Sequence, residues 1–270
     1  METESHSRHY PAKPAAVYLF ATCLVDQFAP DAGLDTVRLL EREGIVVHFP
    51  EDQTCCGQPA YTSGQLDAAR TVARRQIDLF PEPWPVVVPS GSCAAMMRHH
   101  YPKLFAADPL LAARTRELSE RIFELTEFLV HVVGFDRPDR GAPCAVALHT
   151  SCHARREMNV HETGDALLAG LAGVSVAHPE RTEECCGFGG TFAVRHPDIS
   201  AAIAADKVAS LAATGTGHVV SADMGCLCNI LGRAEHMDRD RDRSRDRAEP
   251  TLSGEHIASF LWRRTHGETA

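Results

Sequence analysis

The sequence contains one cysteine pattern twice, at a spacing close to half of its 270 residues. Each copy has a single cysteine, then a Cys-Cys-Gly triplet, then another single cysteine. The four cysteines of the second copy follow those of the first by 129, 130, 130 and 133 residues. This near-constant offset indicates an internal duplication, so we expect two similar halves. The eight positions are Cys23, Cys55, Cys56 and Cys93, then Cys152, Cys185, Cys186 and Cys226.

Short apolar runs lie just before the cysteines in both copies. "AAVYLFATC" and "CAVALHTSC" each end in a cysteine, and so do "PVVVPSGSC" and "GHVVSADMGC". Runs of this length are typical of buried parallel strands, and helical patterns fill the spaces between them. We therefore predict an α/β fold of two tandem parallel-sheet halves. The cysteines would lie at the carboxyl ends of the strands, which is where open α/β sheets bind ligands.

The same patterns predict the boundaries of the halves. The first repeat is expected over residues 15–135, ending in an amphipathic helix from about Glu117 to Val133, and the second over residues 144–236. Residues 237–250 alternate Asp with Arg and are predicted to be a solvated, low-complexity linker. Residues 251–266 have apolar side chains at helical spacing and predict a C-terminal helix that packs on the second repeat.

Composition excludes several classes of protein. The net charge is −9, from 36 acidic and 27 basic residues, so a bulk attraction to nucleic acid or anionic membranes is not expected. The longest apolar run has 11 residues, too few to span a bilayer as a helix. The polar N-terminal segment lacks the apolar core of a secretory signal, so a cytoplasmic protein is expected. Ten cysteines in a reducing compartment favour metal binding or redox chemistry over structural disulfides.

Four thiols in each repeat favour an iron–sulfur cluster. Such clusters are bound by four cysteine thiolates, whereas structural zinc sites usually use C-x2-C pairs, which neither repeat contains. Two adjacent cysteines can reach two different irons of a larger cluster. Glycines next to the double cysteines would let the backbone approach the cluster and offer N–H groups to its sulfur atoms. These glycines are Gly57, Gly187, Gly189 and Gly190.

Other interpretations of the same residues stay open. The double cysteines also fit a vicinal disulfide or a dithiol reductant, and single buried cysteines are common in protein cores. His149 and His153 flank Cys152 and are candidates for donors to sulfur or for proton carriers, or they satisfy local hydrogen bonds only. Arg155 either balances the charge of a cluster or an acidic substrate, or is simply solvated. Cys144 has no counterpart in the first repeat and is interpreted as a core residue.

Five segments, in order, resemble the lactate utilization protein A family. They are "DQFAPDAGLDTVRLLEREGIVVHFPEDQTCCGQPAYTSG", "VVPSGSCAAMMRHHYP", "HTSCHARRE", "ECCGFGGTFAVRHPDIS" and "ADMGCLCNILGR". The resemblance covers about residues 15–236 and resumes in the last helix, and five ordered motifs are far more specific than one. The repeated unit also resembles the cysteine-rich CCG domain of heterodisulfide reductase and of the glycolate oxidase iron–sulfur subunit.

The resemblance implies an iron–sulfur electron-transfer subunit that acts with B-like and C-like partner proteins to oxidise L-lactate to pyruvate. It implies that the eight repeated cysteines are ligands of iron–sulfur clusters, of the 4Fe-4S type. The heterodisulfide reductase pattern adds a fifth cysteine to each unit, but this chain has Met96 and Asn229 there, so five-cysteine ligation does not carry over. Cys228 is interpreted as a spare thiol. The alternatives are a thiol–disulfide oxidoreductase, or the equivalent subunit for another 2-hydroxy acid such as glycolate.

Overall fold

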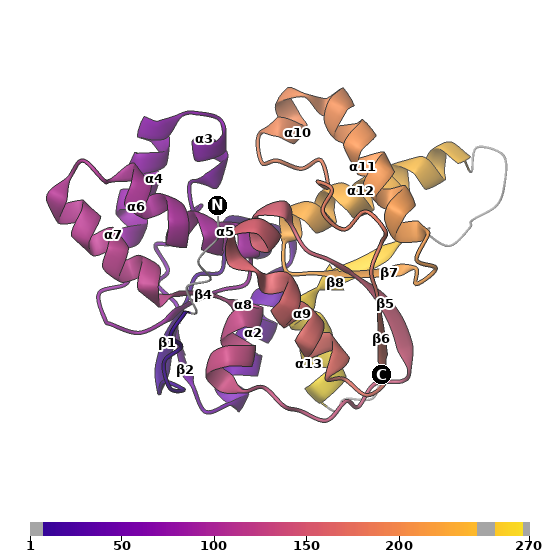
Figure 1. Cartoon of the computed structure of the whole chain (residues 1–270), viewed down its shortest axis with the longest axis horizontal. Coiled ribbons are helices and arrows are strands. Elements are labelled where there is room, and N and C mark those ends of the chain that lie inside the picture. The colour runs from indigo at the N-terminus through magenta and orange to yellow at the C-terminus, as the bar shows by residue number, and fades with distance from the viewer. Residues whose placement is uncertain (1–7, 242–251, 267–270) are drawn as a thin grey trace, which may run out of the picture.

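The computed structural model describes residues 8–241 and 252–266. In this part of the chain the strands form two sheets of four parallel strands each, with helices between the strands. The strand order is β2-β1-β3-β4 in the first sheet and β6-β5-β7-β8 in the second. Figure 1 shows the two halves side by side, each with its own sheet. The predicted α/β fold of two tandem parallel-sheet halves is confirmed.

The first half contains the following elements. Its strands are β1 (Ala16–Leu19), β2 (Val46–His48), β3 (Val86–Val88) and β4 (Ile122–Glu124). Its helices are α1 (Cys23–Phe28), α2 (Pro30–Arg42), α3 (Gln58–Thr62), α4 (Leu66–Ile77), α5 (Gly91–Ala95), α6 (Tyr101–Leu104), α7 (Pro109–Arg121) and α8 (Leu125–Phe128). Two π-helical turns, η1 (Met96–His100) and η2 (Leu129–Val133), extend α5 and α8.

The second half follows the same plan. Its strands are β5 (Cys144–His149), β6 (Val174–Ala177), β7 (His218–Ser221) and β8 (Ser253–His256). Its helices are α9 (Val160–Ala169), α10 (Phe192–Arg195), α11 (Pro197–Ala212), α12 (Met224–Arg241) and α13 (Ile257–His266), with a π-helical turn η3 (Ala154–Met158) after Cys152.

Strand register shows that the duplication seen in the sequence is also present in the structure. Leu19 of β1 pairs with Val87 of β3, and Leu148 of β5 pairs with Val220 of β7. In each half the first cysteine of the pattern comes four residues after that paired leucine. The equivalent strands therefore deliver equivalent cysteines to the carboxyl edge of each sheet.

The sequence prediction missed the fourth strand of each sheet. Residues Glu117 to Val133 were expected to form one helix, but α7 ends at Arg121 and β4 follows it, paired with β3. The prediction was wrong because β4 has only three residues, all buried, and so shows no alternation of polar and apolar side chains. Likewise, the C-terminal segment begins as strand β8, and its helix α13 starts only at Ile257.

Two further expectations concern the C-terminal part of the chain. Residues 237–241, expected in the linker, continue helix α12, and residues 242–250 lie outside the described residues. Helix α13 contacts β7 and β8 of its own half, but it also packs against α2 of the first half. Arg42 of α2 donates hydrogen bonds to the carbonyl and hydroxyl oxygens of Thr265, at 3.1 and 2.8 Å.

A shared apolar core joins the halves. Val17 and Val87 of the first sheet belong to the same buried cluster as Val146 and Val220 of the second. Helices α2, α8, α9 and α13 lie between the two sheets in Figure 1 and contribute side chains to this cluster. Each half also has a separate cluster on the other face of its sheet, and both of these clusters include cysteines.

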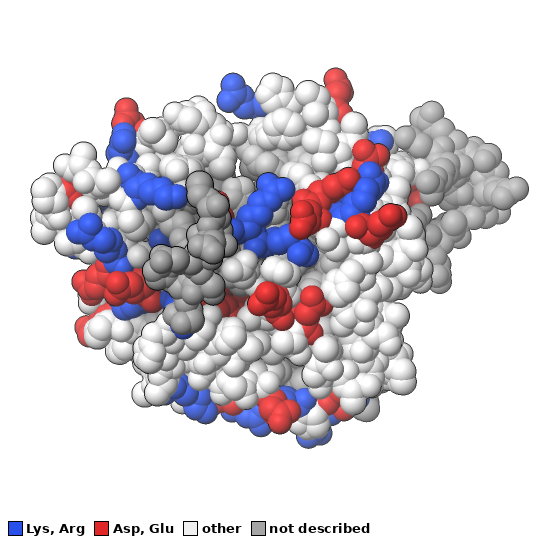
Figure 2. Space-filling model, viewed as in Figure 1, with Lys and Arg blue, Asp and Glu red and all other residues white. Residues whose placement is uncertain are grey.

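The surface carries charges of both signs. Figure 2 shows Lys and Arg side chains interspersed with Asp and Glu on the face it presents, with several basic side chains near α5, where the halves meet. Among the described residues, no helix is both long enough and apolar enough to cross a membrane.

Candidate metal centres

The fold brings the four pattern cysteines of the first half together. Cys23 begins α1, Cys55 and Cys56 lie in the loop between β2 and α3, and Cys93 lies on α5. The sulfur atoms of Cys56 and Cys93 are 3.4 Å apart. The thiol of Cys56 donates to Cys93, and both Cys23 and Cys56 interact with the sulfur of Cys55. The four sulfur atoms therefore form one connected set at the carboxyl edge of the sheet.

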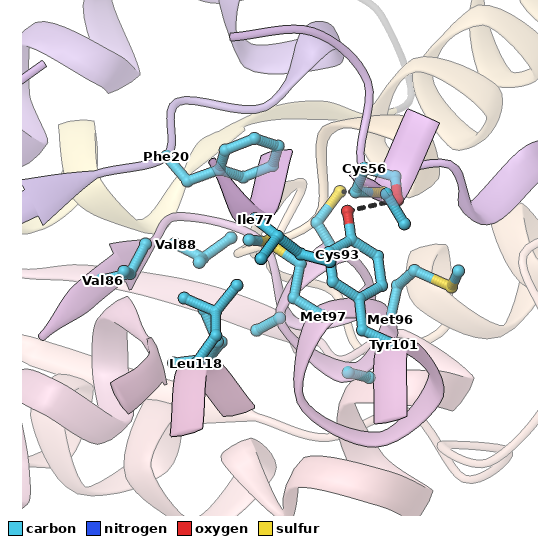
Figure 3. Close-up of a cluster of buried hydrophobic side chains, with 14 of the residues drawn as sticks. Phe20, Cys56, Ile77, Val86, Val88, Cys93, Met96, Met97, Tyr101 and Leu118 are labelled. Atoms are coloured by element: carbon cyan, nitrogen blue, oxygen red, sulfur yellow. Dashed lines mark hydrogen bonds between the residues drawn. The ribbon is translucent and has the colours of Figure 1, made fainter. Parts of the chain in front are cut away.

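Local backbone geometry holds these thiols in place. Gly57 has φ +86°, which lets its N–H donate to the sulfur of Cys55 at 3.5 Å. Thr22 caps α1 through its hydroxyl group and has φ +68° and ψ +146°, a strained conformation for a residue other than glycine. Tyr101 donates its hydroxyl proton to the carbonyl oxygen of Cys56 at 2.9 Å, as Figure 3 shows.

The second half repeats the arrangement more tightly. The thiol of Cys186 donates to Cys226, with 3.1 Å between the sulfur atoms, and both Cys152 and Cys186 interact with the sulfur of Cys185. Gly187, with φ +84°, donates its N–H to the sulfur of Cys185 at 3.3 Å. The four pattern cysteines of this half therefore form the second connected set.

Three candidate residues around Cys152 differ in their contacts. A ring nitrogen of the buried His149 lies within 4.8 Å of the sulfur atoms of Cys186 and Cys226. Its Nε2 atom has no hydrogen-bond partner among the described residues. His153 places Nδ1 3.7 Å from the sulfur of Cys152. Arg155 lies on η3, with a buried Nε atom that has no partner among the described residues.

Thiol–thiol hydrogen bonds polarise both sets. The Cys23 and Cys56 thiols and the Gly57 N–H lower the pKa of Cys55 to about 3, although burial opposes the shift. The Cys152 and Cys186 thiols similarly lower the pKa of Cys185 to about 2. Each set therefore holds a thiolate at neutral pH, and the thiolate is the form of cysteine that binds metal.

The cysteines that interact with Cys55 and Cys185 have raised pKa values. The Cys23 thiol donates to Cys55, and together with burial this hydrogen bond raises the pKa of Cys23. The pKa values of Cys56, Cys152 and Cys186 are raised for the same two reasons. In the second set, the hydrogen bond from the Cys186 thiol and the nearby His149 lower the pKa of Cys226 to about 7, although burial opposes the shift.

The loop that follows Cys186 reaches the first half. Gly189 and Gly190 both have positive φ angles and carry the chain to Thr191. The hydroxyl groups of Thr191 and Ser63 are 2.5 Å apart, which links this loop to the end of α3. The glycine-rich loop therefore contacts the segment that follows the other double cysteine.

Met96 and Asn229, which replace the fifth cysteine of the heterodisulfide reductase pattern, have structural contacts of their own. Asn229 donates from Nδ2 to the carbonyl oxygen of Cys186 at 2.8 Å, a bond equivalent to that of Tyr101 in the first half. Met96 is completely buried in the apolar cluster of the first half. Cys144 lies at the start of β5, 3.6 Å from Nη1 of Arg264, and Cys228 is half-buried on α12.

Sequence reasoning missed two buried charged residues near the thiols, Lys207 and Asp223. Lys207 of α11 is fully buried and donates to the carbonyl oxygen of Arg181 at 2.6 Å. Asp223 accepts hydrogen bonds from the hydroxyl group of Ser90 and the N–H of Ser92, across the boundary between the halves. Lys207 is the only lysine between Val160 and Ala270, and that isolation in an Ala-rich helix was a usable signal.

The residues present fit a metal ion or an iron–sulfur cluster. Each half has four thiols within one connected set, a backbone N–H directed at sulfur, and a thiolate at neutral pH. The second set also has a buried imidazole nitrogen close to two sulfur atoms. Thiolate sulfur and imidazole nitrogen are ligands that soft and intermediate metals prefer.

This geometry defines a class of protein: a duplicated cysteine-rich α/β protein with one four-thiol site in each half. The CCG family model, described as "Cysteine-rich domain", matches residues 17–98 and 146–231, one match in each half. The chain is 41% identical over 224 residues to Lactate utilization protein A of Bacillus cereus (strain B4264), covering 83% of this chain and 93% of that protein. The match to Lactate utilization protein A of Bacillus cytotoxicus is also 41%, over 223 residues, with the same coverage.

The chain therefore belongs to the lactate utilization protein A family, as the sequence motifs indicated. Its fold also resembles the crystal structure of a hypothetical protein from Helicobacter pylori, with a TM-score of 0.67 at 9% sequence identity. The match covers 97% of this chain and 52% of the other, so the chain spans about half the length of that protein. At this level of identity the likeness concerns the fold alone.

Proposed function

We propose that the chain is the iron–sulfur electron-transfer subunit of a multi-protein system that oxidises L-lactate to pyruvate. The observation that carries the proposal is the pair of four-thiol sets, one at the carboxyl edge of each sheet. A dithiol enzyme needs two cysteines at a site, and each half has four. The name of the relatives, Lactate utilization protein A, supports the choice of lactate as the substrate of the system.

In this proposal the four pattern cysteines of each half hold one cluster. Iron–sulfur clusters accept and release single electrons without large changes in structure. Around them the protein supplies the N–H groups of Gly57 and Gly187 as donors to sulfur. Cys56, Cys93, Cys186 and Cys226 are buried, which limits the access of water and oxidants to that side of each site.

The proposal requires partner proteins. Oxidation of a 2-hydroxy acid releases two electrons, which need a first acceptor close to the substrate. The sequence has no G-x-G-x-x-G motif for a dinucleotide. We therefore assign the contact with substrate, or the final transfer of electrons, to B-like and C-like partner proteins in the cytoplasm.

The test begins with protein purified without oxygen. We expect iron and acid-labile sulfide, together with broad absorbance in the blue region. Pyruvate formation is then measured with an artificial electron acceptor, first with the chain alone and then with both partners, and turnover is expected only in the mixture. Turnover by the chain alone would show that it is a complete enzyme. An iron-free protein that reduces disulfides would instead establish the thiol–disulfide oxidoreductase, and activity with glycolate but not lactate would change the substrate.

A further inference from the structure

The two thiol sets lie in different electrostatic surroundings, beginning with the residue three positions before the first cysteine of each set. In the first half this residue is Phe20, a completely buried apolar side chain of the same cluster as Cys56 and Cys93 (Figure 3). In the second half the equivalent residue is His149. A ring nitrogen of His149 lies within 4.8 Å of the sulfur atoms of Cys186 and Cys226, so the second set has a polar group close to sulfur where the first set has only an apolar ring.

A second difference lies on the helix after each double cysteine. Gly57 approaches α4 at the carbonyl oxygen of Ala69, and Gly187 approaches α11 at that of Ser200. Seven residues further along, the buried side chains are Gln76 and Lys207, respectively. The two helices therefore place a neutral amide and an ammonium group at equivalent buried positions.

The ammonium group of Lys207 lies within electrostatic range of the second thiol set. Cys185 and Cys186 are among the groups that interact with it electrostatically. In the first half, Gln76 instead donates to the hydroxyl group of Thr54 at 2.7 Å. Glu184 also interacts with Lys207, but its carboxylate is 44% exposed and pairs with Arg181, so water and that arginine reduce its field.

A third difference also makes the surroundings of the second set more positive than those of the first. Asp26 follows Cys23 by three residues and lines a cavity of about 320 Å³ together with Cys23 and Glu51. At the equivalent position after Cys152 the second half has Arg155. Acidic groups thus lie beside the first set, whereas a basic residue follows the first cysteine of the second.

The two sets are also linked across the boundary between the halves. The N–H of Cys93 donates to the hydroxyl group of Ser90, which donates to the carboxylate of Asp223 at 2.9 Å. The carbonyl oxygen of Asp223 accepts the N–H of Cys226 at 3.1 Å. A short series of hydrogen bonds thus connects a cysteine of one set to a cysteine of the other.

We propose that the second site has the higher affinity for electrons, so that an electron entering the first site moves on to the second, and that His149 and Lys207 set this order. This inference rests on the proposed function. Reduction adds one negative charge, which a nearby cation or a donor to sulfur stabilises. The step is a one-electron transfer: the first site is oxidised, the second is reduced, and no bond forms or breaks.

The test measures the two sites separately. Cys56→Ser and Cys186→Ser each remove one site, and the midpoint potential of the remaining site is found by redox titration followed by electron paramagnetic resonance, with dithionite as the reductant. The native chain, partly reduced, is titrated in the same way in case a variant fails to fold. We expect the electron to favour the second site by at least about tenfold, which is about 59 mV for one electron.

Substitutions that exchange the equivalent residues of the two halves test whether His149 and Lys207 cause the difference in potential. His149→Phe and Lys207→Gln reproduce the first half and should each lower the potential of the second site only. Phe20→His and Gln76→Lys are the reciprocal changes and should raise the potential of the first site. Lys13→Met removes an exposed lysine that donates to the carbonyl oxygen of Glu43 at the end of α2, and it should leave both potentials unchanged.

The outcomes separate this inference from the proposed function. Two loaded sites of equal potential, or a higher potential at the first site, would overturn the inference and leave the iron–sulfur function intact. Exchange variants that shift neither potential would overturn the roles of His149 and Lys207. A chain that binds no iron in either half would overturn the proposed function and this inference with it.

Discussion

Within each double cysteine, the two thiols have different neighbours. The sulfur of Cys55 accepts from Cys23 and from the N–H of Gly57, whereas Cys56 lies beside Cys93 in the buried part of the site. The pair Cys185 and Cys186 divides in the same way. Adjacent cysteines thus connect a more exposed thiol to a buried one.

The first prediction distinguishes ligands from spare thiols. Cys55→Ser and Cys186→Ser should each reduce bound iron by about half, because each removes the middle of one four-thiol set. Cys144→Ser and Cys228→Ser should leave it unchanged, since neither residue belongs to a set. Iron per chain is measured in anaerobically purified protein. Full iron in both double-cysteine variants would contradict the ligand assignment.

The second prediction compares two equivalent glycines. A Cβ atom at Gly187 would lie 2.6 Å from the carbonyl oxygen of Ser200, whereas one at Gly57 would lie 3.4 Å from that of Ala69. Both residues have positive φ, which costs an alanine about 1–2 kcal/mol. The overpacking at Gly187 adds about 1–3 kcal/mol. Gly187→Ala should therefore lower the free energy of unfolding more than Gly57→Ala.

Urea titrations measure this difference. Gly44→Ala is the matched control, because Gly44 has φ +78° and no atom within 4 Å of the added methyl group, so it reports the backbone strain alone. Gly57→Ala should resemble this control. Equal losses for all three variants would show that the approach of Gly187 to α11 is not tight.

Among the elements, the unpredicted strand β4 and helix α8 depend on a buried carboxyl group. Glu124 ends β4 and caps α8, accepting hydrogen bonds from the N–H groups of Thr126 and Glu127. Glu127 in turn forms ion pairs with Arg98 and with Arg8 from the N-terminal segment. This cap begins a new helix directly after the strand, so the element boundary depends on contacts from distant parts of the chain.

The third prediction follows from the burial of Glu124. Burial raises its pKa from 4.5 to about 8, although bonds from Thr126 and Glu127 oppose the shift. The folded state thus binds a proton that the unfolded state releases, so stability should fall as pH rises from about 4.5 to about 8. Glu124→Gln removes this titration and should become progressively more stable relative to the native chain over that range.

The measurement is the free energy of unfolding in urea at several pH values. Each unit of pKa difference corresponds to about 1.4 kcal/mol, so the change with pH should be readily detected. Glu120→Gln, on the last turn of α7, is a control with an exposed carboxylate. If the difference between the native chain and Glu124→Gln does not change with pH, the carboxyl group is not buried as described.

At the scale of the whole molecule, the halves are related by reciprocal contacts. Helix α5 of the first half packs against η3 of the second, and α12 of the second packs against α1 of the first. The helix after each fourth strand also crosses over, because α8 contacts α9 and α13 contacts α2. His256, at the end of β8, lies 3.0 Å from the carbonyl oxygen of Pro89 and 2.9 Å from that of Ala222, one from each half.

The fourth prediction follows from the shared core: both halves should unfold in one transition. The chain has two tryptophans, Trp84 in the first half and Trp262 on α13. In Trp262→Phe the remaining Trp84 reports on the first half, and in Trp84→Phe the remaining Trp262 reports on α13, where its ring contacts Arg38 and Arg42 of α2. In urea, the fluorescence of each variant should have the same midpoint as its own circular dichroism. Separate midpoints within a variant would show that the shared core does not couple the halves.

The sequence alone determined the duplication, the α/β class and the eight cysteines at the strand ends. These features are local: the spacing of the cysteines and the apolar runs before them are visible along the chain. Tertiary structure decided the rest. Strand β4 depends on pairing with β3, Asn229 on its bond to Cys186, and Lys207 on the burial that places its charge near thiols distant in sequence. Pairing, burial and electrostatic fields act between distant segments, so no local pattern records them.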